Sequence, residues 1–221
     1  PLRDRFTDEY RCAFGWLSGA IELDISNRLL RLQSMNNAFV MEAANVKGFR
    51  ILEGSKPLFE GSVDALRCHE TDIVDRVNAL APQISQYLIQ KREMDFREEM
   101  ERRRAEREGE DGNNISRVNT YHRLELPVPF QKFHIEITLD HPYWKSYRWE
   151  KDAPSFNSEY PSIEDYLGSY QVMTEELHVL ALNLMQIINP NAREIAANEQ
   201  PAQSAQMTAA TQAMPVISAV D

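Results

Sequence analysis

Three segments of this chain carry apolar residues at alternating spacings of four and three, which gather side chains along one face of an α-helix. In residues 8–47 the stripe runs through Ile25, Leu29, Leu32, Asn36, Phe39, Ala43 and Val46. A second stripe, in a segment that begins near Ser62, contains Ile73, Val77, Leu80, Ile84 and Tyr87. A third contains Tyr166, Tyr170, Met173, Leu177, Leu180, Leu184 and Ile187. The pattern predicts three helices that pack lengthwise on other helices.

Residues that start and stop helices lie at the ends of these segments. Thr7 is a plausible N-cap of the first helix, and Gly48 a plausible stop. Pro82 falls within the second stripe, where it should kink or break the helix. Ser162 is the expected N-cap of the third helix, which Asn189-Pro190 should end.

The second segment continues into a charged run, residues 91–111. It holds seven basic and nine acidic residues, and several Glu–Arg pairs are four positions apart. Such pairs stabilise an exposed helix, and the mixed signs are unlike a basic nucleic-acid tract. The run therefore predicts a solvated helix that projects from the body.

The period changes from helical to two in residues 133–139, where Phe133, Ile135, Ile137 and Leu139 alternate with polar residues. Alternation of this kind predicts a half-buried strand. Residues 121–128 are the expected partner strand. The residues from Asn191 onward are rich in alanine and contribute little to a core, so an extended tail is expected there.

These elements together predict a mainly α fold: a long antiparallel helical hairpin, a C-terminal helix that packs back along it, and a small two-stranded β element. A coiled coil or helical bundle is the corresponding architecture. The expected division is residues 1–117 for the hairpin with its charged extension, 118–190 for the β element, aromatic loop and C-terminal helix, and 191–221 for the tail.

The net charge of −10 argues against general nucleic-acid binding, which depends on neutralising phosphates. Two cysteines are too few for a disulfide framework, so a cytoplasmic or other reducing intracellular compartment is expected. The N-terminal residues lack the apolar core of a signal peptide, and no apolar run is long enough to cross a bilayer, so membrane insertion is not expected.

A candidate metal site lies on the polar face of the predicted strand. His134 and Glu136 share that face, His141 follows it, and His122 could stand on the neighbouring strand. Imidazole and carboxylate are zinc ligands, but alternation alone also explains their positions. The run Cys68-His69-Glu70 allows a metal or thiol site, although a structural cysteine beside a surface histidine is the simpler interpretation.

An aromatic and basic segment follows, in which we select five candidate interface residues: Tyr143, Trp144, Tyr147, Arg148 and Trp149. Trp, Tyr and Arg are common at the centres of protein interfaces. Aromatics with cations also bind single-stranded nucleic acid, which the acidic net charge disfavours. A third possibility is that these side chains cover one end of the core.

The sequence contains no GxSxG, Cys/His signature, Walker A loop or GxGxxG, so no catalytic residues and no cofactor are assigned. We expect a non-enzymatic structural or adaptor subunit that assembles through its helical stripes and tail, by self-association or within a larger complex. The alternative is a metal-dependent enzyme or a nucleic-acid-binding module centred on residues 122–151.

Overall fold

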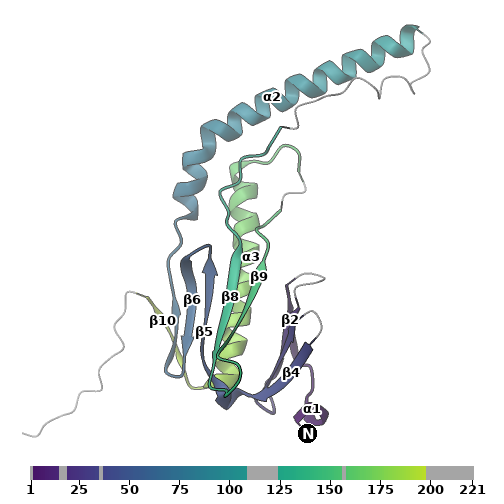
Figure 1. The fold of residues 1–221 in the computed structure, drawn as a ribbon. Helices are drawn as coiled ribbons and strands as arrows, with labels where there is room; N and C mark the ends of the chain where they lie inside the picture. Colours follow the sequence, from purple (N-terminus) through teal and green to yellow (C-terminus); the bar gives the residue numbers. More distant parts are fainter. Residues whose placement is uncertain (1, 15–18, 35–36, 109–123, 156–157, 198–221) are drawn as a thin grey trace, which may run out of the picture.

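The structure is a computed structural model that describes residues 2–14, 19–34, 37–108, 124–155 and 158–197. In that part of the chain, two β-sheets and two long helices form the fold, after a short N-terminal helix, α1 (Leu2–Arg5). Figure 1 shows the two sheets on either side of helix α3, and helix α2 projecting away from them. The architecture is mixed α and β. The prediction of a mainly α hairpin, coiled coil or helical bundle is therefore wrong.

A four-stranded antiparallel sheet occupies the segment that the sequence pattern assigned to one long helix, residues 8–47. Its strands are β1 (Tyr10–Ala13), β2 (Ala20–Asp24), β3 (Leu29–Ser34) and β4 (Asn37–Glu42), paired in chain order. A short 3₁₀ turn, η1 (Ala43–Asn45), follows it.

The reason for the error lies at the turn between β2 and β3. Ile21 and Leu23 before the turn, and Leu30 and Leu32 after it, are fully buried, so period two was present beside the helical spacing. The Asp24 carboxylate accepts a hydrogen bond from the Asn27 backbone N–H at 2.9 Å, and Arg28 has a φ of 53°, a left-handed conformation that an α-helix does not contain. Turn chemistry and alternation together outweigh the four-three spacing.

A six-stranded sheet forms the other layer, in the order β10-β7-β6-β5-β8-β9. Its strands are β5 (Val46–Glu53), β6 (Lys56–Ser62), β7 (Ala65–Cys68), β8 (Phe133–Leu139), β9 (Ser146–Lys151) and β10 (Arg193–Ala196). The stretch between the first two predicted helices contains the β5–β6 hairpin, turned at Gly54 with φ of 58°. Gly tolerates this left-handed conformation because it has no Cβ.

Strand β8 confirms the alternation predicted for residues 133–139, since its four apolar residues are buried. Its neighbours are β5 and β9, both antiparallel. The predicted partner, residues 121–128, is wrong for 124–128, which form no strand; 121–123 lie outside the described residues. The predicted extended tail is also corrected at its beginning, because β10 pairs in parallel with β7. Residues 198–221 of that tail lie outside the described residues.

Helix α2 (Ile73–Glu108) has 36 residues and continues through Pro82 without ending there. At 1.5 Å per residue it is about 54 Å long. Its first turns carry the buried residues Ile73, Val77 and Ile84, whereas most of residues 89–108 are exposed. The helix therefore leaves the body as the charged run predicted (Figure 1).

Helix α3 (Ile163–Ile188) has the limits that the sequence predicted. Ser162 caps it and Asp165 completes a capping box, while Asn189 is its C-cap. The helix contacts β5, β6 and β7 of one sheet and β2 of the other. The Arg28 guanidinium, from the β2–β3 turn, donates to the carbonyl of Ile187 at 2.9 Å, where a cation is favoured by the helix dipole. The core thus lies around α3, between the sheets.

Candidate functional site

The residues predicted to bind a metal lie on or beside β8, but the structure does not bring them together. The Glu136 carboxylate is occupied by Arg50 at 2.8 Å and Arg148 at 3.5 Å. The ring of His141 stacks on Trp144 with centroids 4.5 Å apart. The Nδ1 atom of His134 is buried and has no hydrogen-bond partner among the described residues. These side chains do not form a ligand set within the described part of the chain, where one such set lies elsewhere. His122 lies outside the described residues.

The aromatic segment divides between the core and the surface. The Trp149 side chain is buried, and its indole N–H donates to the Gln33 carbonyl at 3.2 Å. Trp144 packs on Phe39 with ring centroids 4.4 Å apart. Gln33 and Phe39 belong to the four-stranded sheet, and Trp149 lies on β9 of the six-stranded sheet. These two contacts therefore join the sheets.

The other members of the segment are more exposed. Tyr147 is half-buried and stacks on Trp149 with centroids 5.7 Å apart. Tyr143 is 83% exposed, and Arg148 extends from β9 toward Glu136. An interface role for the segment stays a prediction, and only its exposed members are accessible for one.

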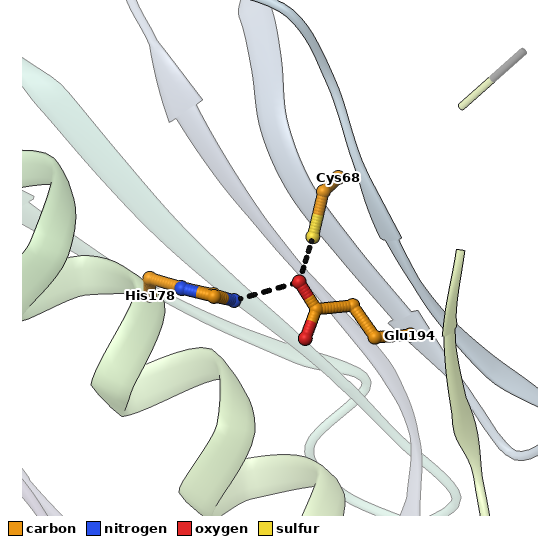
Figure 2. A group of neighbouring side chains, drawn as sticks. All are labelled: Cys68, His178 and Glu194. Atoms are coloured by element: carbon orange, nitrogen blue, oxygen red, sulfur yellow. Dashed lines mark hydrogen bonds and ion pairs between the residues drawn. The ribbon is translucent and has the colours of Figure 1, made fainter. Parts of the chain in front are cut away.

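A different group gathers where β7, α3 and β10 meet. Cys68 is the last residue of β7, His178 lies in the middle of α3, and Glu194 lies on β10. One ligand atom from each lies within 4.8 Å of the other two, and no other set of three or more His, Cys, Asp or Glu residues does so in the described part of the chain. Figure 2 shows the three side chains converging.

The Glu194 carboxylate is at the centre of this group. Its Oε1 atom accepts a hydrogen bond from the Cys68 thiol at 3.2 Å and lies 3.1 Å from Nε2 of His178 (Figure 2). Phe59, directly opposite Cys68 on β6, stacks on the His178 ring with centroids 5.0 Å apart. This stacking holds the imidazole next to the cysteine. The His178 and Glu194 side chains are 34% and 47% exposed, so solvent reaches the group.

The electrostatics of the group do not favour a nucleophilic cysteine. Burial, together with the hydrogen bond to Glu194 and its charge, raises the pKa of the Cys68 thiol to about 12. Nucleophilic attack requires a thiolate, which a histidine in contact with the sulfur can generate by accepting the thiol proton. Here the histidine contacts the carboxylate, and the carboxylate keeps the thiol protonated. Thiol, imidazole and carboxylate are, however, a common donor set for a transition metal.

No family model, curated protein or solved structure matches this chain. The site must therefore be interpreted from its own residues. The sequence drew attention to Cys68 with His69 and Glu70, but His69 pairs instead with Glu60 at 2.9 Å. The true neighbours were missed because His178 lies within a helical stripe and Glu194 in the expected tail. No local spacing relates Cys68 to Glu194, which is 126 residues away.

A second candidate region is the outer part of α2, residues 89–108. Ile89, Phe96 and Met100 are 58%, 66% and 51% exposed. At 100° per residue these three positions fall within about 40° of arc, on one face. None of the helices in the described residues is apolar over a length that could cross a membrane. Contiguous exposed apolar patches mark interaction sites on soluble proteins, so this face of the helix is a candidate contact surface.

Proposed function

We propose that this protein is a non-enzymatic assembly subunit that self-associates through the outer part of α2. The observation that carries the proposal is the exposed apolar face of Ile89, Phe96 and Met100 on a helix that has left the core. Burial of such side chains stabilises an association by about 25 cal/mol per Å². A second copy of the same chain is the occupant that the charges favour.

The charges along the outer helix are arranged in two blocks of opposite sign. Residues 93–101 contain five acidic residues and one arginine, and residues 102–107 contain four arginines and one glutamate. An antiparallel pair centred near residue 101 places each acidic block opposite a basic block and brings the two Met100 side chains together, whereas parallel pairing opposes like charges. The antiparallel contact also has the two-fold symmetry of most homodimers.

The ion pairs inside the helix do not prevent this arrangement. Arg103 and Glu99 are 2.5 Å apart, and Arg102 and Glu106 are 3.9 Å apart, on exposed side chains. Exposed pairs contribute about 0–1 kcal/mol, so their side chains reorient at small cost. The outer segment of 20 residues is about 30 Å long, which makes a small interface. We therefore expect weak, concentration-dependent and salt-sensitive association.

The test is sedimentation velocity over a range of protein concentrations at low and high salt. The wild type should pass from monomer to dimer as protein concentration rises. Added salt should raise the protein concentration at which the dimer forms. The double substitution Phe96→Glu and Met100→Glu should abolish dimerisation. Val172→Glu is the matched control, because Val172 is 68% exposed but lies on α3. A monomeric wild type at all concentrations, or a double variant that still dimerises, would contradict the proposal.

The alternative of an enzyme or nucleic-acid-binding module centred on residues 122–151 has less support. Glu136 is occupied by two arginines, and Trp149 is buried where no base could stack on it. Both cysteines are free, which fits the reducing compartment proposed from their small number.

A further inference from the structure

The meeting point of β7, α3 and β10 presents three different donor atoms at one place. They are a thiol sulfur, an imidazole nitrogen and a carboxylate oxygen, each from a separate element. We propose that Cys68, His178 and Glu194 bind one divalent transition-metal ion of the zinc type. This inference goes beyond the proposed assembly function and does not depend on it, because α2 contributes no ligand.

The distances between the donor atoms are close to those that a tetrahedral ion requires. With bonds of about 2.3 Å to sulfur and 2.0–2.1 Å to nitrogen or oxygen, sulfur should lie about 3.6 Å from each other donor, and nitrogen about 3.4 Å from oxygen. The observed separations from Glu194 Oε1 are 3.2 Å to Cys68 Sγ and 3.1 Å to His178 Nε2. The remaining sulfur–nitrogen separation is no more than 4.8 Å. Small side-chain rotations therefore suffice.

The chemistry of the donors selects the class of ion. Mg²⁺ and Ca²⁺ prefer sets made of oxygen donors, whereas a thiolate with an imidazole suits zinc and related ions. Binding breaks the S–H bond of Cys68, forms a sulfur–metal bond, and releases the proton to solvent, with no change of oxidation state. The Glu194 oxygen then coordinates the metal ion, where before it accepted the hydrogen bond from the thiol.

Solvent has access to the group, so an ion can enter and one coordination position can hold water. A hollow of about 320 Å³ lies beside Cys68 and is also lined by Ala196 and Ala197. Three protein ligands with a fourth, open position is the arrangement of zinc sites that retain a bound water. The stacked Phe59 ring limits rotation of the His178 ring.

A bound ion would fasten β10 to the rest of the fold. This strand has four residues at the edge of the six-stranded sheet, and it pairs with β7 alone. Short edge strands are among the elements that open at low free-energy cost. A metal held by β7, α3 and β10 together would raise that cost and order the C-terminal end of the described chain.

The experiment uses the full chain, reduced and freed of metal with a chelator, titrated with Zn²⁺ by calorimetry and with Co²⁺ by absorption spectroscopy. We expect one ion per chain, a raised melting temperature, and a thiolate-to-cobalt charge-transfer band. Cys68→Ser and Glu194→Gln should each weaken binding more than tenfold, and Cys68→Ser should remove the band. Glu194 is half-exposed, so its variant should fold.

Three control variants distinguish this site from metal binding elsewhere on the chain. His69→Gln tests the neighbouring histidine, and His134→Gln tests the set expected from sequence; both should bind Zn²⁺ as the wild type does. The Phe96→Glu, Met100→Glu variant should also bind normally, so failure of the assembly proposal leaves this test intact. Absence of binding in the wild type, undiminished binding by Cys68→Ser and Glu194→Gln, or loss in His134→Gln instead would overturn the assignment.

Discussion

Replacement of Glu53 by glutamine should be among the most destabilising conservative changes in this protein. Glu53 ends β5 and is 4% exposed. Its two carboxylate oxygens accept from the Arg76 guanidinium at 2.8 and 2.6 Å. The Gln131 backbone N–H donates to it at 3.0 Å and the Tyr170 hydroxyl at 2.8 Å. One carboxylate thus joins the base of α2, helix α3 and the chain that enters β8.

The expected loss follows from what the substitution leaves behind. Glu53→Gln keeps the shape but removes the charge, and Arg76, whose side chain is 22% exposed, remains with a weaker partner. Removal of one member of a buried ion pair costs about 3–5 kcal/mol. Arg76 also has Asp72 at 3.0 Å, which lowers the cost. We therefore expect the free energy of unfolding to fall by about 3 kcal/mol, the lower end of that range.

The same carboxylate predicts how stability depends on pH. Burial raises the pKa of Glu53, but hydrogen bonds from Arg76, Gln131 and Tyr170, together with the Arg76 charge, outweigh it and hold the pKa below its ordinary value of 4.5. A carboxyl with a lowered folded-state pKa stabilises the fold above its unfolded-state pKa, and this contribution is lost as pH falls through the folded-state value. The wild type should therefore lose stability below about pH 4.5 more steeply than Glu53→Gln.

The assay is urea unfolding, followed by circular dichroism, at neutral and acidic pH. Glu136→Gln is the matched control, because its carboxylate also contacts two arginines but its side chain is 25% exposed. That change should cost about 1 kcal/mol or less. A loss below about 1 kcal/mol in Glu53→Gln, or equal losses in both variants, would refute the reasoning that burial makes the Glu53 contacts strong.

Three further predictions concern the contact between the two sheets and two of the glycines. Trp149→Phe removes the hydrogen bond to the Gln33 carbonyl and should lower the free energy of unfolding by about 1–3 kcal/mol in urea titrations, whereas an unchanged value would mean that the joint is not stabilising. Gly168→Ala should raise the free energy of unfolding by up to about 1 kcal/mol, because alanine favours a helix and a Cβ there meets nothing within 4 Å. Gly61→Ala should lower the free energy of unfolding by about 1–3 kcal/mol, because the added Cβ would lie 2.0 Å from the Phe49 ring. Equal changes in the two glycine variants would contradict this.

Local signals predicted elements well where they agreed with one another. At α3, the Ser162 cap, the apolar stripe and Asn189-Pro190 all indicate the same helix, and the structure has it. At β8, alternation is uninterrupted over seven residues. In residues 8–47 the signals conflicted, because four-three spacing and alternation coexisted. The turn at Asp24 decided between them, and its hydrogen bonds were not recognised from sequence.

The candidate metal group could not be predicted in the same way. Cys68, His178 and Glu194 belong to a strand, a helix and an edge strand whose meeting depends on the parallel pairing of β10 with β7. A local pattern reports which face of an element is buried, but not which distant element covers that face. His134 and Glu136 were found because they share one strand, yet nearness along a strand did not make them a ligand set.

By itself, the sequence determined the limits of α3, the alternation of β8 and the charged helix that leaves the body, because caps, periodicity and charge act within a few residues. Only the tertiary structure decided that residues 8–47 form a sheet, that Glu53 holds α2 to α3, and that a thiol, an imidazole and a carboxylate meet at β10. Each of these depends on strand pairing and burial between segments far apart in the chain, whose free energy no local window contains.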